Sequence, residues 1–360
     1  MTTATKKGQD FWSKRRKTAR SKVIDISRDD LVEESFLGEH PVPLVIKPRL
    51  KEMDLISWVA RHQKDLHEKV LRYGGILFRG FNIKSAGDFE RFNDAIGINL
   101  MKYMEGATPR SNVTAKVATS TAFPPEQTIF PHNELCYVNT WPQHILFCCM
   151  TAADEGGETP IVDVRKVYKR LHPHITERFR GRGWMLKRNF GFGFGRDWRE
   201  SFHVNTREEL EAYCKQAGLS YEWREGEVLR TSQVRPAVAD HPVTGERLWF
   251  NHIAFWHLSS LEPNLRDFML KDFGEDGLPF ASYYGDGTPI EDEVIEEMRV
   301  AYDAEKIAFP WEVGDILILD NMLIAHGREP YKGDRLILAV LADATSKRFL
   351  REDDPDADVC

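Results

Sequence analysis

The stretch FPWEVGDILILDNMLIAHGREPYKGDRLILAVLAD, residues 309–343, decides the fold class. It contains two runs rich in branched apolar residues, VGDILILDN (313–321) and DRLILAVLAD (334–343), separated by a glycine-containing polar segment. Short apolar runs bounded in this way predict buried strands. His326 stands just past the first run and Arg335 opens the second, so a metal-binding group and an anion-binding group are expected at strand ends.

The same strand pattern recurs upstream and alternates with helical periodicity. Branched or aromatic runs bounded by proline or glycine predict strands at 74–83, 113–121, 143–152, 159–164, 235–242 and 247–255. Apolar residues at helical spacing predict helices at 54–72, 165–180, 207–218 and 290–306. No repeat or low-complexity linker divides these pieces. The sequence therefore predicts an α+β, mainly β fold in one catalytic domain, with a β-sandwich or jelly roll core, flanking helices and a long insert.

Charged segments lie at both ends of the chain. Residues 6–22, KKGQDFWSKRRKTARSK, form a basic run, and residues 351–360, REDDPDADVC, are acidic. Charge runs are usually solvated, although a basic arm also suits an acidic partner. We predict a mobile basic arm at 1–35, a single domain at 36–350 and a frayed acidic tail at 351–360.

Composition excludes several protein classes. The 360 residues are 42% hydrophobic and 29% charged, which is typical of a folded globular protein and not of a disordered, fibrous or membrane protein. The net charge of −7 provides no overall basic field for nucleic acid. No apolar run is long enough for a membrane span and no secretory signal is recognisable. Five cysteines without a C-x-x-C pair predict reduced thiols and a cytoplasmic location, and homo-oligomer formation stays open.

The triplet His132-Asn133-Glu134 is the first candidate metal motif. Residues two apart on an extended backbone point to the same side, so His132 and Glu134 can direct an imidazole and a carboxylate at one point. His326 is the candidate third ligand. Two imidazoles and a carboxylate leave coordination positions open, as iron(II) enzymes that bind a cosubstrate and O₂ require. The same donors also suit zinc, and H-x-E alone is frequent by chance.

Arg335 strengthens the metal hypothesis. It lies nine residues beyond His326, and a hairpin over GREPYKG would place it on the strand paired with the one that delivers His326. A guanidinium there can hold the distal carboxylate of a keto acid by two parallel hydrogen bonds while the keto acid chelates the metal. In isolation, an arginine at a strand end is more often a surface residue.

Several motifs together resemble a known family. They are HNE (132–134), GGETP (156–160), RNFGFGF (188–194), WFNHIAFWH (249–257) and the block 309–328 followed by GDR. The combination looks like the TauD/TfdA family of 2-oxoglutarate dioxygenases, over about residues 40–350. It is most similar to the branch with clavaminate synthase, the asparagine hydroxylase of nonribosomal peptide assembly and the syringomycin-pathway aspartyl hydroxylase.

The resemblance implies a double-stranded β-helix fold and a set of site residues. His132, Glu134 and His326 would bind Fe(II), Arg335 would hold 2-oxoglutarate, and Thr159 would bond the same carboxylate. With O₂, such a site would hydroxylate an unactivated C–H bond of a small-molecule substrate, an amino acid or similar compound, free or bound to a carrier protein, in specialised metabolism. The ligand is Glu134 where the taurine enzyme has aspartate. Because this position carries a carboxylate, the halogenase variant of the chemistry is disfavoured.

Alternatives remain open at this stage. The same oxidant can give desaturation, cyclisation or epoxidation. A non-catalytic jelly-roll binding module and a zinc hydrolase are more remote, because neither has a use for Arg335 and Thr159. Asn251 and His252 are further candidates, either as substrate contacts or as core polar groups, and Arg328 either contacts an acidic substrate group or forms a surface ion pair. The glycine-rich segment with Gly191, Gly193 and Gly195 is a candidate lid with hinges at these glycines. Arg110, Ser111 and residues 119–121 resemble the substrate-side segment of the family.

Overall fold

The computed structural model describes residues 22–24, 31–101, 113–114, 117–120, 123–191 and 196–346. Most of the predicted basic arm and the whole acidic tail lie outside these residues. Within the described part of the chain, no helix is long and apolar enough to cross a membrane.

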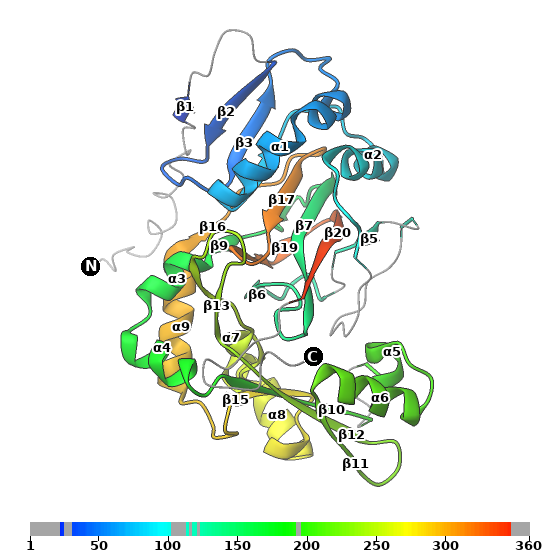
Figure 1. Cartoon of the computed structure of the whole chain (residues 1–360), viewed down its shortest axis with the longest axis vertical. Coiled ribbons are helices and arrows are strands. Elements are labelled where there is room, and N and C mark those ends of the chain that lie inside the picture. Colours follow the sequence, from blue (N-terminus) through cyan, green and yellow to red (C-terminus); the bar gives the residue numbers. More distant parts are fainter. Residues whose placement is uncertain are drawn as a thin grey trace, which may run out of the picture.

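An eight-stranded sheet forms the centre of the molecule (Figure 1). All its neighbouring strands are antiparallel except the parallel pair β3 and β4. Within this sheet the long strand β7 lies between β17 and β20, which are the last two strands that the sequence predicts. In spatial order the strands are β1 (Lys22–Ile24), β2 (Val32–Phe36), β3 (Leu44–Pro48), β4 (Gly75–Phe78), β17 (Ile316–Asp320), β7 (Thr140–Thr151), β20 (Leu336–Ser346) and β5 (Ala118–Thr119).

Alternation along β17 separates the two faces of this sheet. Ile316 and Ile318 pack with helices α1 (Leu55–Tyr73) and α2 (Ala86–Ile96), which cover one face. Helix α1 begins at the N-cap Asp54, whose carboxylate accepts from the N–H groups of Ile56 and Ser57. It ends at Gly74, which has φ 72° and leads directly into β4, so the predicted helix–glycine–strand unit is confirmed.

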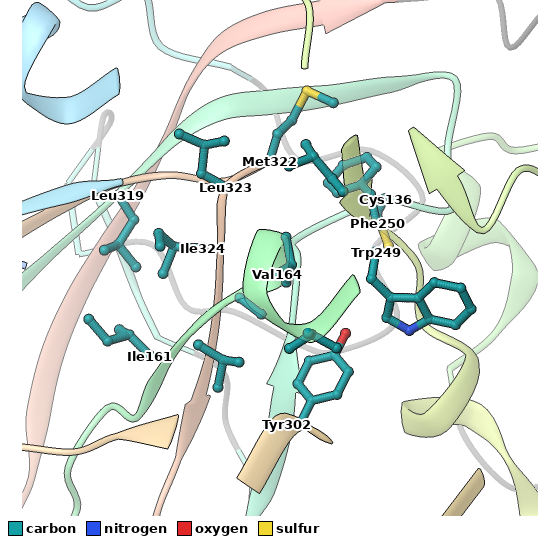
Figure 2. Close-up of a cluster of buried hydrophobic side chains, with 14 of the residues drawn as sticks. Cys136, Ile161, Val164, Trp249, Phe250, Tyr302, Leu319, Met322, Leu323 and Ile324 are labelled. Carbon is teal, nitrogen blue, oxygen red and sulfur yellow. The ribbon is translucent and has the colours of Figure 1, made fainter. Parts of the chain in front are cut away.

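The other face packs against a second, four-stranded antiparallel sheet. Its strands, in spatial order, are β16 (Lys306–Ile307), β9 (Ile161–Asp163), β18 (Ile324–Arg328) and β6 (Ile129–His132). Leu319 of the large sheet and Ile161 and Ile324 of the small one share the largest buried core (Figure 2). A two-stranded ladder, β8 (Glu155–Gly156) with β19 (Tyr331–Lys332), lies beside them.

The predicted long insert forms a third layer at the end of the molecule opposite α1 and α2 (Figure 1). It has its own sheet, β11 (Ser220–Trp223), β12 (Leu229–Arg235), β10 (Trp184–Phe190) and β15 (Phe280–Tyr284). Around it lie α5 (Trp198–Phe202), α6 (Arg207–Ala217), η1 (Leu258–Ser260), α8 (Pro263–Phe273) and η2 (Glu275–Gly277). The hairpin of β13 (Val238–Asp240) with β14 (Arg247–Trp249) packs instead against the helices α3 (Val164–Arg170) and α4 (Pro173–Arg180). Remaining helices are α7 (Ile253–Trp256) and α9 (Asp292–Glu305).

The mixed α+β architecture with several antiparallel sheets is as predicted, and two local predictions were wrong. The helix predicted at 165–180 is two helices, α3 and α4, because Pro173 lacks the N–H that an unbroken helix needs. The strand predicted at 247–255 ends at Trp249, and the short helix α7 follows.

A buried ion pair joins the end of β4 to the start of β17. Arg79 donates to both carboxylate oxygens of Asp315 over 2.6 to 3.2 Å, and Asp315 is fully buried. Burial raises the pKa of the Asp315 carboxyl, and the bonds from Arg79 oppose this shift.

We expect Arg79→Met to lower the free energy of unfolding by about 3–5 kcal/mol at neutral pH, because it leaves a buried carboxylate unpaired. A carboxyl whose folded pKa is raised binds its proton more tightly in the folded state, so the deficit should shrink as pH falls. Urea unfolding across pH measures both effects. Adding Asp315→Asn should recover part of the loss; a deficit independent of both changes would contradict the assignment.

Candidate functional site

Two histidines come together on neighbouring strands of the small sheet. His132 is the last residue of β6 and pairs directly with His326 of β18, and their ring centroids are 4.7 Å apart. His326 was expected beyond a strand end; instead it lies in the middle of β18, because the turn 321–323 separates β17 from a further strand. Direct cross-strand partners place their side chains on one face.

Glu134 completes the cluster from a turn. It was expected on an extended backbone, but β6 ends at His132 and Glu134 opens the turn that follows. Its Oε2 lies 4.0 Å from Nε2 of His132 and 3.9 Å from Nε2 of His326. Ligand atoms of the three residues all lie within 4.8 Å of one another, and among the described residues they are the one such group of histidine, cysteine and acidic side chains.

The donor set fits a divalent metal. Bonds from protein nitrogen or oxygen to a metal such as zinc are about 2.0–2.2 Å, so two ligand atoms of one ion are at most about 4.4 Å apart. The spacings from Glu134 lie inside that limit. Nδ1 of His132 lies 2.9 Å from the carbonyl oxygen of Phe130 and must carry the proton, because a carbonyl only accepts. Nε2 of His132 therefore keeps its lone pair for a metal.

A cavity of about 420 Å³, counting the part open to solvent, adjoins the two histidines. Its lining includes four apolar residues, Ile129, Phe147, Ile337 and Ala339, and two arginines, Arg328 and Arg335. Ser120 and Thr159 also line it. Such a mixture of apolar walls and a few convergent polar groups is typical of small-molecule sites.

Arg335 is held in the cavity wall by neutral groups. Its Nε donates to the carbonyl oxygen of Gly157 over 2.8 Å, and its Nη2 lies 3.4 Å from Oγ1 of Thr159. Trp311 Nε1 donates to the same Thr159 oxygen over 3.1 Å. Burial, and secondly the positive charge of Arg328, lower the pKa of Arg335 to about 10. A cation in this position favours the arrival of an anion.

Arg335 does not lie on the strand predicted for it. The connection after β18 pairs through β19 with β8, and Arg335 directly precedes β20, which belongs to the large sheet. The hairpin prediction was wrong because the chain crosses from one sheet to the other between His326 and Arg335. Both side chains still line the one cavity between the sheets.

Arg328 does not form the surface ion pair that was one of its two predicted roles, as far as the described residues show, and its contact with an acidic substrate group stays a prediction. Its guanidinium donates to the carbonyl oxygens of Phe123, Pro124 and Gln127, in the segment before β6, and it is 5% exposed. Within the described residues, neither Arg328 nor Arg335 has a carboxylate at ion-pair distance. The cavity therefore carries two arginines, and neither forms an ion pair with a carboxylate of the described residues.

The remaining candidates are distributed around the site. The Asn251 amide bonds the backbone of Ala237 and Ile253, as a core group does. His252 packs against His132 at 5.2 Å and contacts Sγ of Cys136, and burial lowers its pKa. Gly191 has φ 93° at the end of β10. The other predicted lid glycines, Gly193 and Gly195, lie outside the described residues, as do Arg110, Ser111 and Thr121.

Sequence reasoning missed Trp311, the Gly157 carbonyl and Asn321. Trp311 and Asn321 both stand in the quoted block 309–328, and Asn321 bonds the backbone of Glu134. Only their place in that motif could have drawn attention to them.

Comparisons with known proteins place the chain among dioxygenases. Residues 40–341 match the model of the taurine catabolism dioxygenase TauD, TfdA family. The chain is 37% identical over 321 residues to the dapdiamide synthesis protein DdaC of Enterobacter agglomerans, covering 89% of this chain and 90% of that protein. A clavaminate synthase-like protein of Arabidopsis thaliana is 29% identical over 84% of this chain and 93% of its own length.

Solved structures support the fold. PvcB from Pseudomonas aeruginosa superposes with a TM-score of 0.53 at 18% identity, covering 88% of this chain and 93% of that chain. A second structure of PvcB, described as an Fe, alpha-ketoglutarate dependent oxygenase from an isonitrile synthetic pathway, gives a TM-score of 0.53 at 17% identity, over 89% of this chain and 96% of its own.

Proposed function

Because the chain belongs to the TauD/TfdA family of dioxygenases, we propose that it hydroxylates an unactivated C–H bond of an amino acid or a similar small molecule. It is an Fe(II)- and 2-oxoglutarate-dependent dioxygenase. The observation that carries the proposal is the convergence of His132, Glu134 and His326 beside a cavity that also holds Arg335. The family match disfavours the non-catalytic module and the zinc hydrolase.

In this proposal His132, Glu134 and His326 hold iron. Two neutral imidazoles and one carboxylate are the set that leaves coordination positions open for a cosubstrate and O₂. The Phe130 carbonyl sets the tautomer of His132, and the strand pairing of His132 with His326 keeps both rings on one face. With 2-oxoglutarate and O₂ present, the bound metal supplies the oxidation of the C–H bond, coupled to formation of succinate and CO₂.

Arg335 and Thr159 hold the distal carboxylate of 2-oxoglutarate. The Nε of Arg335 donates to the carbonyl oxygen of Gly157, which orients the guanidinium plane, and Arg335 lines the cavity. Oγ1 of Thr159 receives N–H groups from Trp311 and Arg335, so its own hydrogen is available to a carboxylate. Phe147, Ile337 and Ala339 keep this part of the cavity apolar, which strengthens these charged contacts.

Three finer points belong to the same proposal. The large and small sheets correspond to the two faces of a double-stranded β-helix, and residues 36–350 form one dioxygenase domain. The similarity to the dapdiamide synthesis protein supports a role in specialised metabolism, with a free or carrier-bound substrate. Desaturation or cyclisation remains the alternative outcome, and the cytoplasm remains the proposed location.

Product analysis with labelled O₂ tests the function. The purified enzyme, loaded with Fe(II), is supplied with 2-oxoglutarate and a panel of amino acids, free and amide-linked. We expect a substrate to accelerate succinate formation and to gain one labelled oxygen atom. A product that has instead lost two hydrogens would support desaturation. Absence of succinate under all conditions would contradict the proposal. His257→Ala, a change outside the site, is the control variant and should turn over as wild type does.

A further inference from the structure

We propose that Asn321 is a positioning residue of the metal site, whose side-chain amide fixes the peptide of Glu134 and thereby the direction of the Glu134 carboxylate. The inference rests on the proposed function, because it takes Glu134 as a ligand. Asn321 directly follows β17, is fully buried, and is 187 residues distant from Glu134 in the sequence.

The Asn321 amide bonds both sides of the Glu134 residue. The backbone N–H of Glu134 donates to Oδ1 of Asn321 over 2.7 Å, and Nδ2 of Asn321 donates to the Glu134 carbonyl oxygen over 2.9 Å. The same Nδ2 also donates to the carbonyl oxygen of Pro142 on β7 over 2.9 Å. A side-chain amide has two N–H donors and an oxygen with two lone pairs, and these three bonds use both donors and one of the lone pairs. The Asn321 side chain therefore satisfies both backbone hydrogen-bonding groups of Glu134, as a neighbouring strand would in a sheet.

The backbone around Glu134 needs this support. Leu135, the next residue, is buried and has φ 56°, a left-handed conformation that a residue with a Cβ rarely adopts. Such conformations persist only where the surroundings over-determine them, and they concentrate at functional sites. On the other side, Nδ2 of Asn133 donates to the backbone oxygen of Asn321 over 2.7 Å. Asn321 thus holds the ligand-bearing turn at both Asn133 and Glu134.

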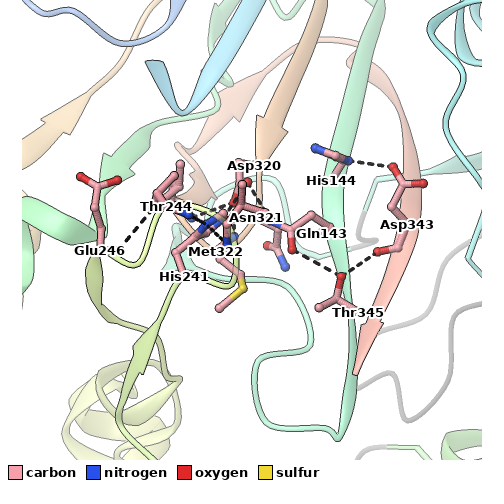
Figure 3. A network of polar contacts seen from close by, with 12 residues as sticks. Gln143, His144, His241, Thr244, Glu246, Asp320, Asn321, Met322, Asp343 and Thr345 are labelled. Atoms are coloured by element: carbon pink, nitrogen blue, oxygen red, sulfur yellow. Dashed lines mark hydrogen bonds and ion pairs between the residues drawn. The ribbon is translucent and has the colours of Figure 1, made fainter. Parts of the chain in front are cut away.

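Asn321 is itself fixed by the polar network in Figure 3. Its backbone N–H donates to the carbonyl oxygen of Gln143 over 2.8 Å. The preceding Asp320 accepts from the N–H groups of Met322 and Leu323, which shapes the turn into β18, and from Gln143 and His241. The dipeptide Asp320-Asn321 therefore sets both the turn that leads to His326 and the peptide that carries Glu134.

Asn321→Ala tests the proposal against a matched buried asparagine. Asn189, on β10 of the insert, is 6% exposed and also makes three side-chain hydrogen bonds, to Asp276, Leu278 and Arg230. Both alanine variants should therefore lose similar stability. We expect Asn321→Ala to bind Co(II) roughly 10- to 100-fold more weakly than wild type, the usual effect of removing support from a ligand, and to show an altered visible Co(II) spectrum. Asn189→Ala should match wild type in both.

The outcomes separate this inference from the proposed function. If wild type and Asn321→Ala bind Co(II) with equal affinity and equal spectra, Asn321 has only a structural role and the inference is overturned. If wild type itself fails to bind, the metal site is wrong. Should Asn321→Ala not fold, Asn321→Asp decides: it keeps the shape and the acceptor for the Glu134 N–H but loses both donors. Weakened Co(II) binding supports the inference, and unchanged binding refutes it.

Discussion

His326→Ala is expected to abolish iron-dependent turnover and to remove the visible charge-transfer band that forms when 2-oxoglutarate is added anaerobically to the Fe(II) protein. Changes to residues that merely support a ligand weaken metal binding by about 10- to 100-fold, so loss of a ligand should cost more than about 100-fold. We expect this loss because His326 lies in the middle of β18 opposite His132. Among the described residues, no other histidine, cysteine or acidic side chain lies with His132 and Glu134 in a group that could hold a metal.

His257→Ala provides the control. His257 is a partly buried histidine outside the site that bonds Ser259 and the Ile290 carbonyl oxygen. This variant should keep the band and the Fe(II) affinity of wild type, which calorimetry under argon measures. Retention of both in His326→Ala would remove His326 from the ligand set, and the metal would then have to be sought elsewhere.

Local pattern was enough to single out the three residues that the structure brings together, His132, Glu134 and His326, but not their geometry. The H-x-E triplet and the block ending in His326 are short motifs, and each stands at or near a strand as predicted. Glu134 nevertheless approaches the two histidines from a turn, and the left-handed Leu135 directly follows it. The backbone conformation of an apolar residue such as Leu135 leaves no mark in the sequence.

Long-range relations were the main part that the sequence did not reveal. The eight residues between His326 and Arg335 fit a hairpin, yet the chain uses them to cross from the small sheet to the large one. Asn321 bonds Glu134 across 187 positions, and Trp311 bonds Thr159 across 152. Such contacts depend on the packing of the two sheets, so no local periodicity predicts them.

Arg335→Ala is expected to weaken 2-oxoglutarate binding while leaving Fe(II) affinity unchanged. The guanidinium lines a cavity with several apolar residues in its wall, and it forms no ion pair with a carboxylate of the described residues. Loss of one partner of a buried charged pair costs about 2–5 kcal/mol, which corresponds to roughly 30- to several-thousand-fold in the dissociation constant. Titration of the charge-transfer band with 2-oxoglutarate measures this change.

Arg335→Lys separates charge from shape. A lysine keeps the positive charge but cannot make two parallel hydrogen bonds to a carboxylate, nor can it donate to the Gly157 carbonyl in the same geometry. Its affinity for 2-oxoglutarate should therefore lie between those of wild type and Arg335→Ala. If both variants bind 2-oxoglutarate as tightly as wild type, Arg335 is not the clamp. Among the described residues Arg328 would then be the remaining arginine that lines the cavity, and it would become the next candidate for the cosubstrate carboxylate.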